Sequence, residues 1–242
     1  MSYSDLTFKD KNPFKRWLQH ERLRTAVAAS RSKLGTSESR HACDYGAGNG
    51  ELCKELAKAY PTLNLLCYEP VVSLMQEAQE NLKQFNKVRY FDEILGIPSN
   101  SVDALFCLEV FEHLPAKELD DAFVQIERCL TRDGVAIIGV PNEIGVPALY
   151  KGCFRMIRRY GEFDAAPLNI LRSLFGFPPK HRPAAEIAPG LLFHFHHTGF
   201  DHRELKKALL TRFLVSKVIP SPCALLGNWI NPEIYFVVKK LA

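Results

Sequence analysis

Asp44-Tyr45-Gly46-Ala47-Gly48-Asn49-Gly50 is the stretch of this sequence that decides the fold. The run His41–Tyr45 predicts a short strand that enters this turn, and Glu51–Tyr60 predicts a helix that leaves it. Glycines at such a turn allow a tight bend and let a ligand approach backbone N–H groups. The spacing is G-x-G-x-G and not the G-x-G-x-x-G of pyrophosphate-binding turns, so a pyrophosphate cofactor is disfavoured. Taken alone, the motif also fits a plain glycine turn.

Strands and helices alternate outward from this turn. Short apolar strands between helices predict parallel pairing in a sheet covered on both faces, which is a doubly wound α/β fold. The last two strands can pair through a short connection, which makes one of them antiparallel. The predicted strands are Leu65–Tyr68, Val88–Phe91, Val102–Leu108, Val135–Val140, Phe213–Ile219 and Ile234–Lys239, and the predicted helices are Val71–Phe85, Leu119–Leu130 and Arg203–Leu210. We expect one domain over residues 1–242, opened by a helical segment, residues 1–35.

The alternation breaks in residues 142–193, where we predict an insert without strands that forms a mobile lid over the substrate. One predicted helix has an apolar stripe, and basic side chains occupy the rest of its surface. Either the stripe docks on the domain and the charges are solvated, or the helix contacts an anionic membrane or a phosphorylated substrate. The stripe is Leu149, Cys153, Met156, Ile157 and Tyr160, and the basic residues are Lys151, Arg155, Arg158 and Arg159.

Composition indicates an ordinary globular protein, with 47% hydrophobic and 24% charged residues. The net charge of +4 neither requires nor excludes a nucleic-acid partner. Seven cysteines without a C-x-x-C spacing suit reduced thiols, so we expect a cytoplasmic protein. No apolar run is long enough to span a bilayer.

Glu69 is the second element of a nucleotide site. It follows the strand Leu65–Tyr68, about twenty residues after the glycine turn, where a carboxylate can accept hydrogen bonds from both hydroxyls of a ribose. An isolated glutamate at a strand end is usually a solvated charge. Its combination with the glycine turn favours a nucleoside ligand.

Four segments carry a resemblance to a known family. CDYGAGNG, LLCYEP, IPSNSVDALFCLEVFEHL and LTRDGVAIIGVP, in this order and spacing, resemble class I S-adenosylmethionine-dependent methyltransferases, in particular the broad group that includes ubiquinone-pathway O-methyltransferases. The resemblance covers residues 40–141 well and residues 194–240 loosely. It implies a seven-stranded, mostly parallel sheet with S-adenosylmethionine across the carboxyl ends of the first strands.

The resemblance also implies a set of cofactor-binding residues, each at the end of a strand. The methionine half of the cofactor lies at the glycine turn, the ribose at the second strand, the adenine at the third and the sulfonium at the fourth. Asp92 is the preferred adenine contact, but its gap to Asp103 is shorter than usual, so three residues stay open there. By position the set is Asp44, Gly46, Ala47, Gly48 and Gly50; Glu69 and Pro70; Phe91, Asp92 and Glu93; Leu108 and Glu109.

The segment Glu109-Val-Phe-Glu112-His113 is a candidate metal site. If a helix begins near Glu109, the two carboxylates and the imidazole share one face, and His196 or His197 downstream adds a fourth ligand. Small-RNA 3′-end 2′-O-methyltransferases and some ubiquinone O-methyltransferases are similar at this E-x-x-E-H and bind a divalent metal through it. The alternatives are that Glu112 and His113 only shape the loop, that Glu109 serves the cofactor alone, or that His113 is a general base without a metal.

We therefore expect a methyltransferase that uses S-adenosylmethionine, with a divalent metal as a second candidate cofactor. The sulfonium is already activated, so the protein must align a nucleophile and remove its proton, for which Glu112 and His113 are the catalytic candidates. The expected acceptor is a hydroxyl of a small molecule, lipid-like or saccharide-like. An RNA 2′-O-methyltransferase is the second hypothesis, although no RNA-reading module accompanies the motif. A non-catalytic partner protein is the third, and the intact glycine motif argues against it.

Overall fold

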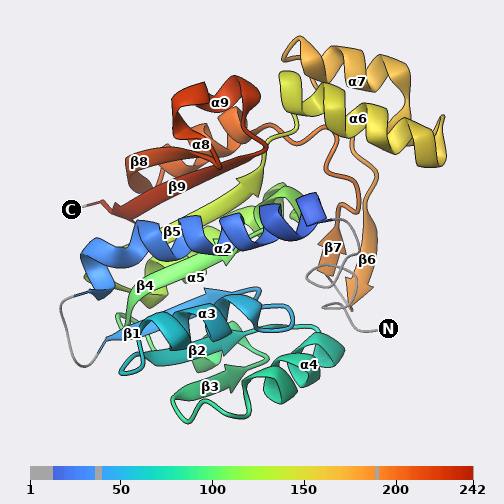
Figure 1. Cartoon of the computed structure of the whole chain (residues 1–242). Helices are drawn as coiled ribbons and strands as arrows, with labels where there is room; N and C mark the ends of the chain where they lie inside the picture. The colour runs from blue at the N-terminus through green and yellow to red at the C-terminus, as the bar shows by residue number, and fades with distance from the viewer. Residues whose placement is uncertain (1–12, 36–39, 189–190, 242) are drawn as a thin grey trace.

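The computed structural model describes residues 13–35, 40–188 and 191–241. A seven-stranded sheet forms the centre, in the order β3-β2-β1-β4-β5-β9-β8 (Figure 1). Neighbouring strands from β3 to β5 pair in parallel, and β9 is antiparallel to both of its neighbours, which confirms the predicted fold class. The strands are β1 (His41–Tyr45), β2 (Asn64–Tyr68), β3 (Val88–Phe91), β4 (Val102–Leu108), β5 (Leu130–Pro141), β8 (Phe213–Ser221) and β9 (Glu233–Lys240).

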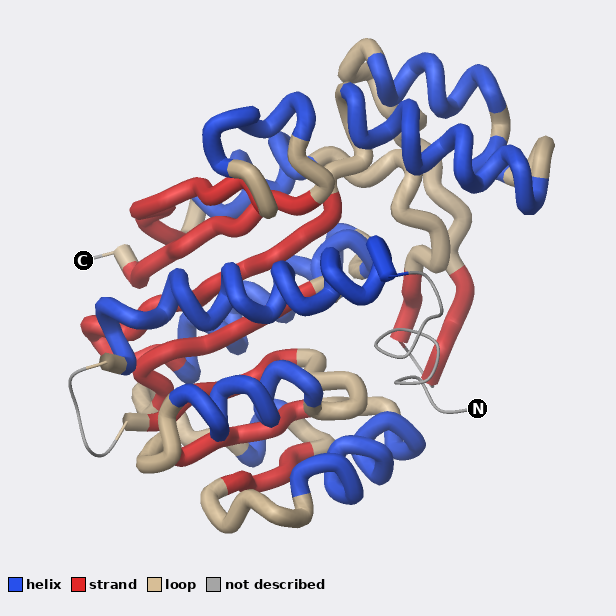
Figure 2. Tube along the Cα trace, viewed as in Figure 1, coloured by secondary structure: helices blue, strands red, loops and turns tan. Residues whose placement is uncertain are grey.

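Helices cover both faces of this sheet, as Figure 2 shows in blue over red. On one face, Leu23, Leu56 and Leu82 of three helices pack against the sheet, and on the other face Phe123 and Leu209 do so. Neighbouring residues of a strand serve opposite faces, because successive side chains alternate. The helices of the first face are α2 (Pro13–Leu34), α3 (Glu51–Ala59) and α4 (Val72–Leu82), and those of the second are α5 (Ala116–Cys129) and α8 (His202–Leu210).

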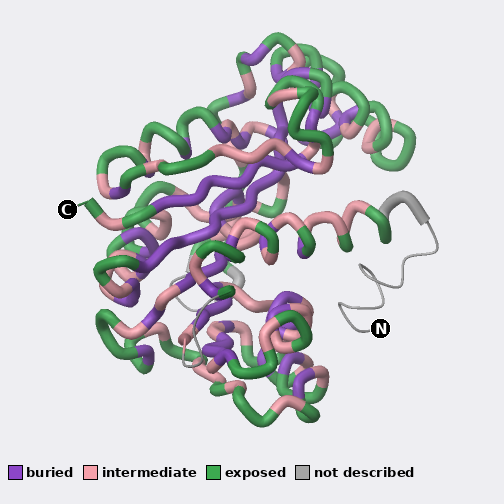
Figure 3. The backbone as a smooth tube through the Cα atoms, turned by 60° about the vertical axis from the view of Figure 1, so that its left-hand side comes forward, coloured by how far each residue is buried: buried purple, intermediate pink, exposed green. Residues whose placement is uncertain are grey.

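The central strands are mostly apolar, which suits a sheet whose two faces are both covered. The segment from Val135 to Val140 of β5 is buried, and the purple strands of Figure 3 lie at the centre of the molecule. Among the described residues, no helix is long and apolar enough to cross a membrane.

The insert consists of a helical hairpin and a small β-hairpin. Helix α6 (Val146–Arg159) packs against α7 (Pro167–Leu174) so closely that a Cβ on Gly152 would lie 2.6 Å from Cγ1 of Ile170. The expectation of an insert without strands is wrong, since β6 (Ala185–Ala188) and β7 (Leu191–Phe193) form an antiparallel pair. These strands are too short for a recognisable alternation of apolar and polar residues.

Helix α6 does not dock through its apolar stripe, which is the orientation that its sequence suggests. Leu149, Ile157 and Tyr160 of the apolar stripe are exposed, whereas Lys151 and Arg155 are partly buried. Both basic residues pair with the buried carboxylate of Glu143, which lies two residues after the end of β5. The helix therefore docks through ion pairs, and its apolar stripe faces outward.

Candidate functional site

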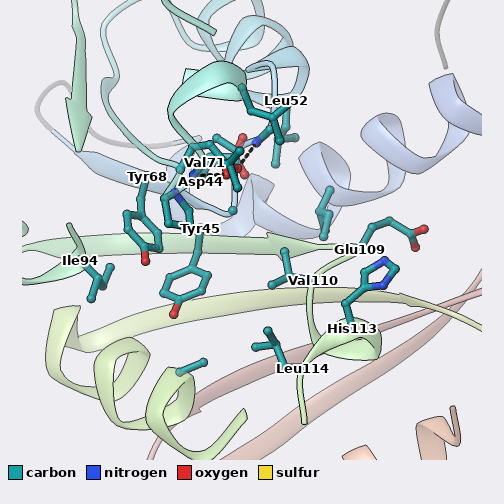
Figure 4. Close-up of a pocket in the computed structure, with 18 of the residues that line it drawn as sticks. Asp44, Tyr45, Leu52, Tyr68, Val71, Ile94, Glu109, Val110, His113 and Leu114 are labelled. Atoms are coloured by element: carbon teal, nitrogen blue, oxygen red, sulfur yellow. Dashed lines mark hydrogen bonds between the residues drawn. The ribbon is translucent and has the colours of Figure 1, made fainter. Parts of the chain in front are cut away.

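A cavity of about 730 Å³ lies at the carboxyl ends of β1, β2 and β4. Its wall includes the glycine turn, the strand-end residues Glu69 and Glu109, and side chains of α2 and α5 (Figure 4). The position agrees with the rule that open α/β sheets bind ligands where the strand order reverses, here between β1 and β4.

The three glycines of the turn share a left-handed backbone for different reasons. Gly46, Gly48 and Gly50 have φ values of 75°, 55° and 80°. A Cβ on Gly46 would lie 2.6 Å from Val110, and one on Gly50 would lie 2.8 Å from Leu82, whereas a Cβ on Gly48 would meet nothing within 4 Å. Gly48 is thus open toward the cavity. Gly50 does not line the cavity, although we expected it to bind the cofactor, because it begins α3 and packs against α4.

Glu69 connects the glycine turn to the loop after β2. Its carboxylate accepts hydrogen bonds from the backbone N–H groups of Gly48 (2.8 Å) and Val71 (2.9 Å). Burial raises its pKa. Each carboxylate oxygen has a second lone pair, so Glu69 can hold the turn and accept hydrogen bonds from a ligand at the same time.

Asp44 is a buried carboxylate on the cavity wall. Its Oδ2 accepts a hydrogen bond from the thiol of Cys53, at 3.6 Å, and the backbone of Cys53 also hydrogen-bonds to the carboxylate. Burial raises the pKa of Asp44 to about 7. Because a weakly paired buried carboxylate is costly, this position suits a cationic group of a ligand.

The three residues predicted to contact adenine lie outside the cavity lining. Phe91, Asp92 and Glu93 do not line the cavity, which is bounded there by Ile94 and Leu95 of the following 3₁₀ turn. Phe91 instead lies beneath the guanidinium of Arg89, 5.2 Å from its ring centroid.

Two tyrosines, which sequence reasoning missed, lie on the cavity wall beside Ile94. The rings of Tyr45 and Tyr68 are 4.9 Å apart and tilted by 58°. Tyr45 is part of the quoted glycine motif, so the motif itself could have indicated it.

Glu109 lines the cavity but is paired with the N-terminal helix. It has a left-handed backbone, with φ of 57°, and its Oε2 lies 3.2 Å from Nη2 of Arg22. The same nitrogen lies 2.7 Å from Oε1 of Glu233. Arg22 thus bridges the ends of β4 and β9. No sequence signal marked Arg22, which lies 87 positions before Glu109 in the chain.

Glu112, His113 and His197 form a cluster whose candidate ligand atoms all lie within 4.8 Å of one another. Nε2 of His113 is 3.2 Å from Nε2 of His197 and 3.6 Å from Oε1 of Glu112. The predicted helical face is wrong, because Phe111–His113 is a single 3₁₀ turn. Glu109 is therefore outside the cluster, and His196 faces Asp164, with Nδ1 3.5 Å from Oδ2.

The imidazoles of the cluster are neutral, and Nε2–H of His197 donates to Nε2 of His113. Nδ1 of His113 donates to the carbonyl of His194 (2.6 Å), which leaves its Nε2 without a proton when the ring is neutral. Burial lowers the pKa of His113 to about 4 and that of His197 to about 3, and it raises the pKa of Glu112 to about 8. Both carboxylate oxygens of Glu112 are buried and have no hydrogen-bond partner among the described residues.

The end of the insert holds the two halves of this cluster together. Nη2 of Arg182 donates to the carbonyls of Glu112 and His196, both at 2.6 Å. The N–H of His194 donates to the carbonyl of His113 (2.7 Å), and the ring of Phe193 stacks on that of His113, 4.3 Å away. His113, in the turn after β4, and His197, after β7, are thus positioned by one compact set of contacts.

Comparisons with known proteins identify the class. Residues 43–138 match the family described as "Methyltransferase domain". This segment contains the glycine turn, the strand-end carboxylates and the motif around Glu112. A search of curated proteins by sequence found no match.

Solved structures share the fold at low sequence identity. The 1,6-didemethyltoxoflavin-N1-methyltransferase of Burkholderia thailandensis, solved with S-adenosylhomocysteine, superposes with a TM-score of 0.59 at 14% identity, over 99% of this chain and 84% of that one. The methyltransferase domain of bacterial-CtHen1-C gives 0.58 at 18%, over 93% and 100%. The mitomycin 7-O-methyltransferase MmcR gives 0.59 at 14%, over 100% and 61%.

Fold, site and family match together define a class I methyltransferase. The open space above Gly48, the weakly paired carboxylate of Asp44 and the strand-end Glu69 fit the parts of S-adenosylmethionine. The protein is an S-adenosylmethionine-dependent methyltransferase with a methyltransferase domain at residues 43–138.

Proposed function

We propose that this enzyme methylates a hydroxyl oxygen of a small-molecule acceptor, lipid-like or saccharide-like, with a divalent metal ion beside the methyl donor. The observation that carries the proposal is the cluster of Glu112, His113 and His197, which offers two neutral imidazoles and a carboxylate without a partner. Methyl transfer to a hydroxyl requires loss of its proton, and a bound divalent metal lowers the pKa of a hydroxyl that it coordinates.

The spacing of the cluster supports a metal ion. Two ligand nitrogens that are each about 2.1 Å from one ion lie roughly 3.0–3.4 Å apart, and the two Nε2 atoms are 3.2 Å apart. Two imidazoles and one carboxylate suit Mn²⁺, Fe²⁺ or Zn²⁺ better than Mg²⁺.

The remaining residues position the donor and exclude water. Asp44 and Glu69 provide the carboxylates for the amino acid and ribose parts of S-adenosylmethionine. The open space above Gly48 lets the cofactor approach the protein backbone. Val110 and Leu114 separate this part of the cavity from His113 with apolar surface (Figure 4). Phe193 on the same wall holds the His113 ring in its orientation.

An RNA acceptor is the second hypothesis, and the E-x-x-E-H cluster favours it. Against it, Lys151 and Arg155 of the basic insert are occupied by the buried carboxylate of Glu143. Two of the four basic residues of this helix are therefore not available to contact the phosphates of an RNA.

Metal binding and methyl transfer together test the proposal. Titration of the purified protein with Mn²⁺ or Zn²⁺ should show one site, which His197→Ala and Glu112→Ala weaken by at least about tenfold. His196→Ala is the matched control, because this neighbouring histidine faces Asp164 and should leave affinity unchanged.

Tritium transfer from labelled S-adenosylmethionine into fractionated extracts identifies the acceptor. We expect label in lipid or polar-metabolite fractions, lost with chelator and restored by metal. Full transfer in excess chelator would exclude the metal and leave His113 as the candidate base, and label in RNA would establish the second hypothesis.

A further inference from the structure

The helical hairpin of the insert exposes an unusual amount of apolar surface. Among its outward side chains, Ile157, Tyr160 and Phe177 have exposed fractions of 84%, 75% and 72%. We call this surface the hairpin face; it consists of Leu149, Tyr150, Phe154, Ile157 and Tyr160 on α6, Leu168, Leu171 and Phe175 at α7, and Phe177. Monomeric soluble proteins rarely expose a large apolar patch unless it binds something.

The outward orientation of this face is fixed by the opposite side of α6. Lys151 and Arg155 point inward, to the two carboxylate oxygens of Glu143, at 3.1 and 2.7 Å. Arg155 also donates to the hydroxyl of Thr198, at 2.6 Å. Rotating α6 to bury its apolar stripe would break these buried ion pairs, which is strongly destabilising. The exposed stripe is therefore a built feature of the fold.

The charge around the hairpin face is positive. Arg158, Arg172 and Lys180 are exposed and form no ion pair with any described residue. Residues 146–181 contain six basic and two acidic residues, and one of the acidic residues, Asp164, is buried. Apolar and aromatic side chains with unpaired basic residues match the interface of a bilayer that contains anionic lipids. A second copy of the same face would bring like charges together, which disfavours a symmetric dimer.

The hairpin face lies at the end of the molecule where the active site opens. Helix α6 begins five residues after β5 ends, on the side of the carboxyl ends of the parallel strands (Figure 1). The insert leads from there through β6 and β7 to the wall of the cavity, which Phe193 reaches. A surface bound through α6 and α7 would thus lie near the acceptor entrance.

We propose that the hairpin face docks this methyltransferase on anionic membrane surfaces. Binding combines insertion of the apolar side chains at the level of the lipid headgroups with attraction between the basic residues and the headgroup charge. It does not depend on which acceptor is methylated.

Cosedimentation with vesicles tests this proposal. The protein should pellet with vesicles of phosphatidylcholine and phosphatidylglycerol, and much less with phosphatidylcholine alone. Ile157→Glu combined with Phe175→Glu should abolish pelleting. Leu214→Glu is the control, because Leu214 is 54% exposed on β8, away from the hairpin.

The contribution of the basic residues to vesicle binding is tested by two triple variants that change the net charge equally. Arg158→Gln, Arg172→Gln and Lys180→Gln together should lower the partition coefficient by roughly a hundredfold at low salt. Lys58→Gln, Lys83→Gln and Lys207→Gln change the net charge equally on α3, the end of α4 and α8, and should have little effect.

Unchanged affinity for S-adenosylhomocysteine shows that each variant is folded. Equal binding to neutral vesicles, equal binding by the Ile157 and Phe175 variant, or self-association through this face without vesicle binding would each overturn the proposal.

Discussion

Gly48 differs from the other two glycines of its motif in what lies above its Cα. Its neighbours Gly46 and Gly50 have the same left-handed backbone, but side chains of Val110 and Leu82 occupy the space above them. The space above Gly48 is open and belongs to the cavity. At this scale, the structure assigns different roles to three residues that are identical in the sequence.

Gly48→Arg should abolish S-adenosylmethionine binding, because the side chain would fill the space of the ligand. Gly227→Arg is the control, since Gly227 has a φ of 61° and equally open surroundings but lies outside the cavity. Isothermal titration calorimetry measures both affinities. An equal loss of affinity in the two variants would mean that backbone strain, and not a blocked ligand site, weakens binding.

Residue positions were predictable where they follow from one local segment. The glycine turn, Glu69, Glu112 and His113 follow strands whose ends meet at one edge of the sheet, so their proximity follows from the pattern. Arg22 was not predictable as the partner of Glu109, because its role depends on how α2 crosses the sheet. Ile94 and Leu95 were also not predicted on the cavity wall, where the 3₁₀ turn after β3 places them.

Helix α6 shows why an element can be predicted while its orientation is not. Its periodicity indicated a helix with an apolar stripe, and the usual inference buries that stripe. In the structure the stripe is exposed instead, because Lys151 and Arg155 on the other side of α6 form ion pairs with Glu143, two residues after β5. The spacing of apolar residues in a sequence cannot indicate that a buried carboxylate will pair with the basic side of a helix. The strands β1 to β4, in contrast, agree with prediction to within a residue, and in β1, β2 and β4 the reason is that their apolar runs are buried.

Glu143→Gln should destabilise the fold near neutral pH by about 3 kcal/mol or more, since Lys151 and Arg155 would lose their buried counter-charge. Burial alone would raise the pKa of Glu143, but the two cations outweigh it and lower the pKa from 4.5 to about 2. A depressed carboxyl pKa contributes stability above the unfolded-state value of 4.5 that is lost as the pH falls through 2.

The stability difference between wild type and Glu143→Gln should therefore shrink by about 3 kcal/mol between pH 5 and pH 2. Urea unfolding at several pH values measures it. A difference that does not change with pH would show that the ion pairs do not hold α6 in place.

At the scale of the whole molecule, the cavity and the insert are built by separate parts of the chain. The cavity is lined by residues at the ends of β1, β2 and β4, whereas the insert carries its own buried ion pairs around Glu143 and Asp164. The two parts meet where Arg182 and Phe193 contact the turn of Glu112 and His113. Ligands that fill the cavity or the metal cluster should therefore stabilise the junction.

Trypsin should cut at the exposed Arg172 and Lys180 more slowly when S-adenosylhomocysteine and Mn²⁺ are bound. Mass spectrometry of the fragments over time gives the rate at each site. In Gly48→Arg, which we expect not to bind the cofactor, S-adenosylhomocysteine should give no protection. Equal rates for the wild type with and without ligands would argue against a lid.

The insert also has a consequence for how such enzymes diverge. None of the three clustered residues Glu112, His113 and His197 lies within residues 142–193, and neither do Asp44 and Glu69. A lineage that keeps Arg182 and Phe193, which position this cluster, can therefore rewrite the rest of the segment without changing the candidate donor site or metal ligands. We expect acceptor choice to vary in this way separately from methyl donation. Related chains could make such a change by exchanging this one segment.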